Sequence, residues 1–309
     1  MSVQSQMSFQ GVWIPLVTPF RDGLPDGAAL RRLVRHYVGQ GVSGFVVCGS
    51  TGEAAALEED EQLSVLDATL EAAGGLPVIM GLAGASQPRL LRRLAALRER
   101  PVAAVLSAAP AYVRPGQGGA MAHFLALADA AHVPLVLYDI PYRTGTTLDT
   151  GTLLALAEHP NIAAIKDCGG SLDKTLALIA HGGLQVLAGE DMQAFGTVAL
   201  GGAGLIAAAA HVRADLYVAM YQALRDQRLD AARRLCLALA PMIRLLYAEP
   251  NPAPLKALLA RQGWLRDELR APMMRAAPGL ALQLEAAAAE LDRLYPPVGE
   301  LEHLYPPAA

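Results

Sequence analysis

Residues 134–168 read PLVLYDIPYRTGTTLDTGTLLALAEHPNIAAIKDC. Two short apolar runs, at 134–141 and 162–168, flank a longer helical pattern. Both runs are continuously apolar rather than alternating, as expected of parallel strands that are buried on both faces. The stretch therefore predicts one strand–helix–strand unit, with Tyr138 and Lys166 near the carboxyl ends of neighbouring strands.

The same unit recurs along the chain. Six further apolar runs lie at 11–20, 44–50, 76–82, 103–110, 184–190 and 204–210, with amphipathic segments such as AALRRLVRHYV (28–38) between them. Eight strand–helix units predict an α/β protein with a closed (β/α)8 barrel, also called a TIM barrel. The alternative is an open doubly wound sheet. That fold normally shows a Gly-rich dinucleotide fingerprint after the first strand, and TPFRDGLPDG (18–27) is not one.

The pattern changes after the eighth run. From residue 229 onward it is wholly helical, and we interpret it as an appended extension. The predicted division is a barrel carrying the active site over 1–228, a C-terminal helical bundle over 229–294, and a proline-rich tail over 295–309. Leu-Tyr-Pro-Pro occurs twice near the end, at Leu294 and Leu304. Proline pairs stop a helix, so we interpret the tail as an ordinary frayed terminus, with a recognition role as the alternative.

Composition narrows the class of protein. The chain has 309 residues, of which 53% are hydrophobic and 17% charged, so it can bury a large core. Its net charge of −4, with both signs scattered, argues against nucleic acid as a partner. No apolar stretch reaches the roughly 18 residues of a membrane span, and the first residues do not resemble a secretory signal. Three distant cysteines favour the cytoplasm, and the absence of metal-binding motifs predicts no metal.

Lysine usage singles out one residue. Only three of the 25 basic residues are lysines: Lys166, Lys174 and Lys256. Lys166 ends a buried strand, where desolvation lowers the pKa of an ammonium and leaves a neutral amine that can attack a ketone. The alternative is a strand-end lysine that pairs with Asp167 for stability. Lys174 opens a helix and is expected to be solvated, whereas Lys256 follows a proline-rich turn and is expected to be structural.

Other strand ends carry polar groups that face the same mouth. Tyr138 lies one strand–helix unit before Lys166, so its phenol can shuttle a proton; it can equally be a tyrosine that merely finds a partner. The turn Gly49-Ser50-Thr51-Gly52-Glu53 offers hydroxyls and backbone N–H groups that can hold a carboxylate, although glycine also suits any strand-to-helix turn. Arg143 follows the fifth strand and has the fork for bidentate carboxylate binding.

Taken in order, these motifs resemble the pyruvate-dependent class I aldolases of the dihydrodipicolinate synthase and N-acetylneuraminate lyase family, and most closely the synthase branch. The resemblance runs from Pro15-Leu16-Val17-Thr18-Pro19-Phe20 to about Leu291, and rests on the 49–53 turn, on Tyr138-Asp139-Ile140-Pro141 and on Lys166. It implies a homo-oligomeric lyase, a dimer or tetramer, that forms a Schiff base with pyruvate and needs no metal or dissociable cofactor.

The resemblance also implies a role for each site residue. Lys166 would condense with pyruvate and Tyr138 would be the general acid/base. Ser50 and Tyr112 would complete a proton relay, with Tyr112 entering from a neighbouring subunit. Binding residues would be Thr51 for the pyruvate carboxylate, Arg143 for the carboxylate of aspartate semialdehyde, and Gly189 and Ile206 as lining.

Some positions depart from the synthase pattern. Asp139 stands where asparagine is common, Asp167-Cys168 replaces Glu-Ala, and Ala208-Ala209-Ala210 replaces a more polar strand end. A retro-aldolase or dehydratase of a 2-keto-3-deoxy sugar acid, in the same family, is therefore the alternative function. Two other classes were weighed: a barrel that only binds a metabolite, which the intact set of site residues argues against, and a metal-dependent hydrolase, which lacks a motif.

Overall fold

The computed structural model describes residues 7–296 and contains the predicted closed barrel. Eight parallel strands form it in the spatial order β1-β10-β9-β8-β7-β6-β5-β4, with β1 closing on β4. Their bounds are β1 Gly11–Pro15, β4 Gly44–Val47, β5 Val78–Gly81, β6 Ala104–Ala108, β7 Leu135–Asp139, β8 Ile162–Asp167, β9 Gln185–Ala188 and β10 Gly204–Ile206. Each strand lies within one of the eight apolar runs of the sequence, and nearly every strand residue is buried.

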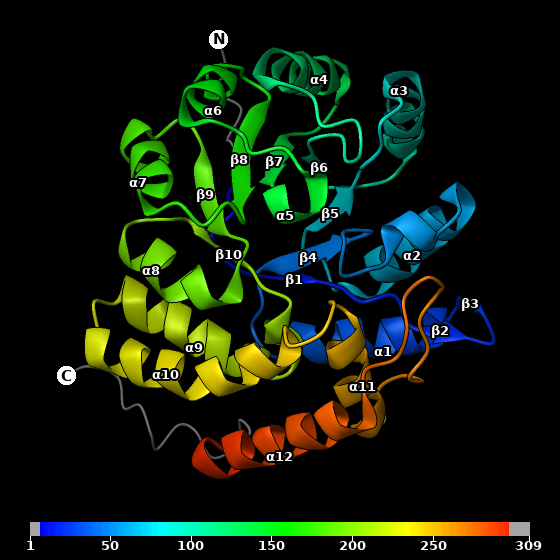
Figure 1. Ribbon diagram of the computed structural model, residues 1–309, viewed down its shortest axis with the longest axis vertical. Helices are drawn as coiled ribbons and strands as arrows, with labels where there is room; N and C mark the ends of the chain where they lie inside the picture. The colour runs from blue at the N-terminus through cyan, green and yellow to red at the C-terminus, as the bar shows by residue number, and fades with distance from the viewer. Residues whose placement is uncertain (1–6, 297–309) are drawn as a thin grey trace.

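Helices surround the barrel, as Figure 1 shows. Those between strands are α1 Gly27–Val38, α2 Glu59–Ala72, α3 Gln87–Ala96, α4 Gln117–Ala130, α5 Pro141–Thr144, α6 Thr150–Ala157, α7 Leu172–His181 and α8 Ala194–Ala199, with α9 Ala214–Arg225 after β10. Short 3₁₀ turns are η1 Ala54–Ala56, η2 Leu97–Glu99, η3 Asp191–Gln193 and η4 Ala209–His211. A two-stranded ribbon, β2 Phe20–Arg21 with β3 Leu24–Pro25, follows β1.

The chain after α9 is helical, in α10 Leu229–Leu246, α11 Ala253–Arg261 and α12 Pro278–Leu294. Leu235, Leu258 and Leu284 from these helices belong to the same apolar cluster as the outer faces of the barrel strands. Figure 1 shows α10 beside α9, with α12 along the lower edge of the molecule. The C-terminal helices therefore extend the main core. The second Leu-Tyr-Pro-Pro copy lies outside the described residues.

A separate apolar cluster fills the inside of the barrel. Phe9, just before β1, and Trp13, within β1, pack in the part of this cluster away from the carboxyl ends of the strands. The Trp13 indole Nε1 donates to the Phe9 carbonyl oxygen at 2.9 Å. Gly44 is the register partner of Trp13 on the neighbouring strand, and a Cβ there would lie 2.3 Å from the indole ring. The inside of the barrel is thus a packed core that leaves chemistry to its carboxyl end.

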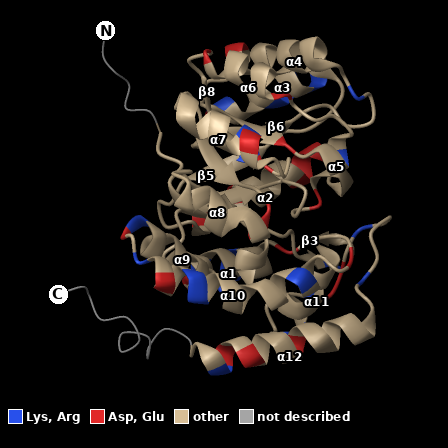
Figure 2. Cartoon of the chain, turned by 60° about the vertical axis from the view of Figure 1, so that its left-hand side comes forward, with Lys and Arg blue, Asp and Glu red and all other residues tan. Residues whose placement is uncertain are grey.

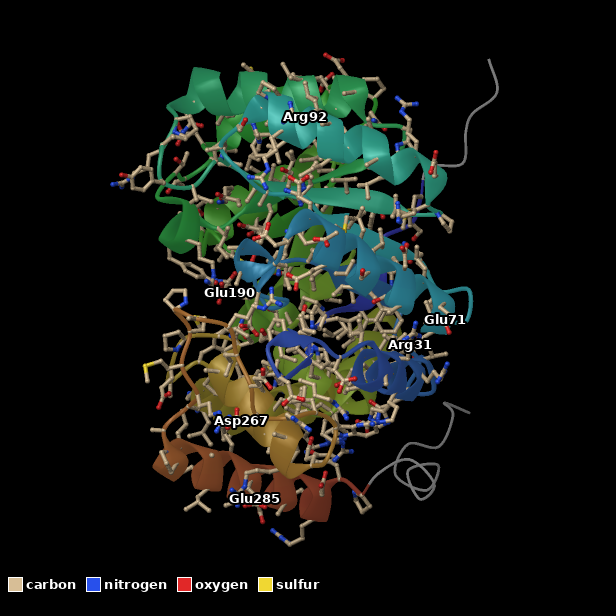
Figure 3. All side chains as sticks on the ribbon, turned by 90° about the vertical axis from the view of Figure 1, so that its right-hand side faces the viewer. Arg31, Glu71, Arg92, Glu190, Asp267 and Glu285 are labelled. Carbon is tan, nitrogen blue, oxygen red and sulfur yellow. The ribbon has the colours of Figure 1, made fainter. Side chains whose placement is uncertain are left out.

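Charged residues lie mainly on the surface, as Figure 2 indicates. Arg31 of α1 and Glu71 of α2, both labelled in Figure 3, form an exposed pair at 2.7 Å. Pairs of this kind stabilise a fold by only about 0–1 kcal/mol each. No helix within residues 7–296 combines the length and apolar character that crossing a membrane requires.

Candidate active site

Six of the residues singled out from the sequence meet in one small cavity at the carboxyl end of the barrel. Its wall includes Lys166, Tyr138, Ser50, Thr51, Arg143 and Gly189. Four further residues complete that wall: Tyr142, Ala208, Tyr247 and Asn251. The predicted strand ends therefore converge on a common mouth, as the barrel geometry requires.

Lys166 and Tyr138 form the centre of this cavity. They are register partners on the adjacent strands β8 and β7, and the Lys166 Nζ lies 4.5 Å from the centre of the Tyr138 ring. The Tyr138 hydroxyl lies 3.4 Å from the Ser50 Oγ, which projects from the turn after β4. Amine, phenol and hydroxyl thus follow one another in space, an arrangement along which a proton can pass.

The environment of Lys166 favours its neutral form. The side chain is buried and forms no ion pair with any residue in the described part of the chain. Burial lowers the pKa of the Lys166 ammonium, and the nearby Cys168, Asp191 and Glu190 oppose this effect only partly. A lower pKa raises the fraction of Lys166 that is a neutral, nucleophilic amine at a given pH.

Tyr138 is held in its protonated form. Burial raises the pKa of the Tyr138 phenol well above its usual value, and the contact with Ser50 offsets this only in part. The phenol is therefore a proton donor at neutral pH and can accept a proton only as another group takes its own.

The alternative in which Lys166 pairs with Asp167 does not hold. Asp167 lies next to Lys166 along the strand, where successive side chains point to opposite faces. Its carboxylate lies 3.4 Å from the Lys174 Nζ instead. The prediction that Lys174 is solvated was wrong, because that side chain is only 5% exposed and also bonds Asp139. Lys174 sits on the inner face of the first turn of α7, so the strand ends cover it.

The turn after β4 is fixed by residues from the C-terminal part of the chain. Glu53 has a left-handed backbone (φ 54°), and its buried carboxylate accepts a hydrogen bond from the Lys256 Nζ at 2.7 Å. The same ammonium donates to the Thr18 carbonyl oxygen at 2.9 Å. Asn251 donates through Nδ2 to the Thr51 Oγ1 at 3.0 Å. Lys256, expected to be structural, is fully buried and holds this turn in place.

A buried carboxylate holds Tyr247, one of the residues of the cavity wall. Asp191, in η3 just after β9, accepts hydrogen bonds from the Tyr247 hydroxyl at 2.6 Å and the Ala209 N–H at 2.9 Å. Burial raises the pKa of Asp191. Asp191 comes directly after the run 184–190, whereas no site role was predicted for Tyr247 or Asn251, which approach from the segment between α10 and α11. Glu190, labelled in Figure 3, lies between the halves of the molecule that carry α3 and α4 above and α11 and α12 below.

Two predicted site residues lie off the cavity wall. Ile206 is completely buried inside the barrel, in the same apolar cluster as Tyr138, so it belongs to the packed interior and not to the cavity wall. Tyr112 follows β6 in a left-handed conformation (φ 70°), and its side chain is 96% exposed. The chain's own site therefore lacks the Tyr112 phenol.

A larger cavity of about 540 Å³ adjoins the small one and shares Ser50, Tyr138, Arg143 and Asn251 with it. Most of its wall is small and apolar, with alanines from the ends of β6 and from η1. Arg143 lies at the junction, where its Nη2 donates to the Asn251 carbonyl oxygen at 3.2 Å. The Arg143 guanidinium therefore lies between the two cavities, and its fork can bind a carboxylate there. No group of three or more histidines, cysteines or acidic residues within 7–296 is arranged to hold a metal ion.

A buried, unpaired lysine amine beside a phenol at the mouth of a (β/α)8 barrel defines a lyase of the class I aldolase type. The chain belongs to the dihydrodipicolinate synthetase family, whose sequence model matches residues 8–291.

Curated relatives agree with this assignment. The chain is 36% identical over 272 residues to the 4-hydroxy-tetrahydrodipicolinate synthase 2 of Clostridium acetobutylicum, covering 87% of this chain and 95% of that protein. It is 41% identical over 265 residues to the 4-hydroxy-tetrahydrodipicolinate synthase of Limosilactobacillus fermentum, covering 84% of each chain.

Solved structures match as well. The dihydrodipicolinate synthase of Thermotoga maritima superimposes with a TM-score of 0.90 at 28% identity, over 92% of this chain and 99% of that one. The chloride-inhibited enzyme of Acinetobacter baumannii, complexed with pyruvate, gives a TM-score of 0.89 at 30% identity over the same shares.

The Lys256–Glu53 pair gives a prediction for stability. We expect Lys256→Met to lower the free energy of unfolding by about 3–5 kcal/mol, because it leaves the Glu53 carboxylate buried without a counter-charge. Urea denaturation measures the change. The matched double variant Glu53→Gln with Lys256→Met should recover most of the loss. Arg261→Met, which breaks an exposed pair with Glu285, should cost less than about 1 kcal/mol. If Lys256→Met lowered the free energy of unfolding by less than about 1 kcal/mol, this would contradict the stabilising role of the buried Lys256–Glu53 pair.

Proposed function

We propose that this chain condenses pyruvate with aspartate semialdehyde through an imine on Lys166, as a 4-hydroxy-tetrahydrodipicolinate synthase. The observation that carries the proposal is the Lys166 amine, buried without an ion pair in the described structure and 4.5 Å from the Tyr138 ring. The names of the relatives support the same reaction.

The first half of the reaction uses the amine and the phenol. The neutral Lys166 Nζ attacks the keto carbon of pyruvate, Tyr138 donates a proton to the departing oxygen, and water leaves to give the imine. The turn at Thr51 binds the pyruvate carboxylate. The Tyr138 phenolate left by that transfer then takes a proton from the methyl carbon of the protonated imine, which gives an enamine and restores the phenol.

The second half joins the two substrates. The enamine carbon attacks the aldehyde of aspartate semialdehyde, whose oxygen takes up a proton delivered through Tyr138. The amino group of the same substrate then attacks the imine carbon, closes the ring and releases Lys166 as a free amine. Arg143, beside the cavity junction, binds the carboxylate of the aldehyde substrate.

Trapping tests the imine. With pyruvate, borohydride should reduce the imine and add a stable mass to the peptide that contains Lys166, whereas Lys166→Ala should gain none and keep its fold. Because burial lowers the pKa of Lys166, the neutral amine should appear, and trapping should speed up, as pH rises through a value below the ordinary lysine pKa of about 10.4. An unmodified Lys166 at saturating pyruvate would refute the proposal.

Arg143 tests the choice of aldehyde. Arg143→Ala should raise the KM for aspartate semialdehyde about 10–100-fold, because it removes charge-assisted hydrogen bonds worth about 1.5–3 kcal/mol. Trapping with pyruvate is the internal control and should stay within about threefold, since the proposed contact of the pyruvate carboxylate is the turn at Thr51 and not Arg143. If the unsubstituted protein traps pyruvate but cleaves or dehydrates 2-keto-3-deoxy sugar acids instead of coupling aspartate semialdehyde, the alternative function holds.

Tyr112 supports a homo-oligomer. The Tyr112 side chain is 96% exposed in a left-handed turn, so it packs against little of its own chain. We place its phenol in the site of a neighbouring subunit, beside Tyr138.

Three exposed leucines support a further contact between subunits. Leu172, Leu200 and Leu237 are 62%, 40% and 67% exposed. They lie on or just after α7, α8 and α10, which follow one another down one side of the molecule in Figures 1 and 2.

Mixed oligomers test the shared site. Tyr112→Phe and Lys166→Ala should each lower kcat at least about 100-fold as pure proteins, because each removes a group that acts on a proton or a carbon. A hybrid purified through two different tags places an intact Lys166 opposite an intact Tyr112. We expect its activity to rise at least about tenfold above either parent. A hybrid that stays at the level of its parents would show that Tyr112 does not act across an interface.

The cysteines support a place in the cytoplasm. Cys48 and Cys168 are buried, Cys236 is partly buried, and all three are free thiols. Burial raises the pKa of the Cys48 thiol to about 12, so it stays protonated and inert. Buried free thiols of this kind are usual in a reducing compartment.

A further inference from the structure

We propose that Lys174 is a positioning residue of this site: clamped between Asp139 and Asp167, it fixes the carboxyl ends of β7 and β8 and thereby the geometry between Tyr138 and Lys166. The proposal rests on the function proposed above, since it concerns the two residues that perform the imine chemistry. It concerns a group that touches neither substrate.

The clamp begins one residue beyond each of these side chains. Asp139 follows Tyr138 on β7, Asp167 follows Lys166 on β8, and the two aspartates are register partners just as Tyr138 and Lys166 are. Because successive side chains of a strand point to opposite faces, the tyrosine and lysine face the barrel mouth while both aspartates face the surrounding helices. A change in the spacing of the aspartates is therefore passed directly to Tyr138 and Lys166.

Lys174 connects the two aspartates. Its Nζ bonds the Asp139 Oδ2 and lies 3.4 Å from the Asp167 Oδ1. The three side chains are 5%, 1% and 3% exposed, so the contact is shielded from water. Although burial works against the charge, the bond to Asp139 raises the pKa of Lys174, which keeps its ammonium charged. An ammonium between two carboxylates in such a place holds them at a fixed distance.

The remaining carboxylate contacts tie the clamp to the surrounding loops. The Asp139 Oδ1 accepts a hydrogen bond from the Leu148 N–H at 3.3 Å. Asp167 accepts from the Gly169 N–H at 2.8 Å through Oδ1 and from the Thr175 hydroxyl at 3.0 Å through Oδ2. Every carboxylate oxygen of the pair thus has a donor, as a buried charged network requires.

Local sequence provides the space for this ammonium. A Cβ on Gly169 would lie 2.1 Å from the Lys174 Nζ and 2.8 Å from the Asp139 Oδ2, so only glycine leaves room for the contact. The compact ammonium of lysine fits where the wider guanidinium, used at 22 other positions of this chain, would not. Two of the departures from the synthase pattern, Asp139 and Asp167, are both partners of this one lysine.

Two variants separate positioning from simple stabilisation. Lys174→Met removes the clamp and leaves two buried carboxylates side by side. The double variant Asp139→Asn with Lys174→Met removes the clamp without leaving that excess charge, and its asparagine can still accept from Leu148. The double variant should therefore unfold at a temperature close to that of the unsubstituted protein, and it carries the test if the single variant fails to fold.

Each variant that folds should have a kcat at least about tenfold below that of the unsubstituted protein. Its rate of borohydride trapping at saturating pyruvate should fall by at least the same factor. The KM for pyruvate should stay within about threefold, because the carboxylate-binding turn follows β4 and not β7 or β8. Arg213→Met is the matched control: it removes another buried cation, which bonds Asp215 and lines neither of the two cavities described above, and it should lower stability without changing kcat.

A double variant with restored stability and an unchanged trapping rate would overturn the proposal, because Lys174 would then only neutralise charge. So would a rise in the KM for pyruvate at constant kcat. If pyruvate and borohydride do not modify the unsubstituted protein at all, the proposed function is wrong and this inference is wrong with it. If the unsubstituted protein is modified and the variants are modified at the same rate, only the role proposed for Lys174 is wrong.

Discussion

Desolvation of one ammonium is the constraint on which the site depends. Closing eight strands into a ring excludes water from the carboxyl end of β8, and an isolated charge is expensive there. Lys166 forms no ion pair with a carboxylate in residues 7–296, and burial lowers the pKa of its ammonium despite the nearby Asp191 and Glu190. The adjacent strand then supplies Tyr138 at the same level of the barrel. An open sheet would leave the amine hydrated and charged.

The three lysines show that the carboxylates near a buried lysine determine what its amine can do. Lys256 is completely buried and bonds Glu53 together with a backbone carbonyl, which makes it part of the framework. Lys174 is buried between two carboxylates and remains charged. Lys166, at a similar depth, has neither kind of partner. We therefore propose that identical side chains at similar burial serve as framework, clamp and nucleophile, according to the carboxylates within reach.

Much of the fold could be predicted from the sequence because its signals are local. Each barrel strand is a continuous apolar run, and the 28 residues from Tyr138 to Lys166 span one strand–helix unit, so neighbouring strand ends followed directly. The burial of Lys174 was missed because helical position gives no measure of how far adjacent loops cover a first turn. The bonds from Asn251 to Thr51 and from Lys256 to Glu53 join residues 200 and 203 positions apart. Such contacts depend on how the C-terminal helices return to the barrel, which no local pattern records.

Those two bonds bear on how the enzyme can be shortened. A chain that stopped after α9 would keep all eight strands, Lys166 and Tyr138, and would still look like a complete catalytic barrel. It would nevertheless lose the ammonium that bonds Glu53 and the amide that bonds Thr51, so the 49–53 turn would have lost its anchors. The minimal unit for engineering or for grafting this chemistry is consequently the barrel together with its C-terminal helices.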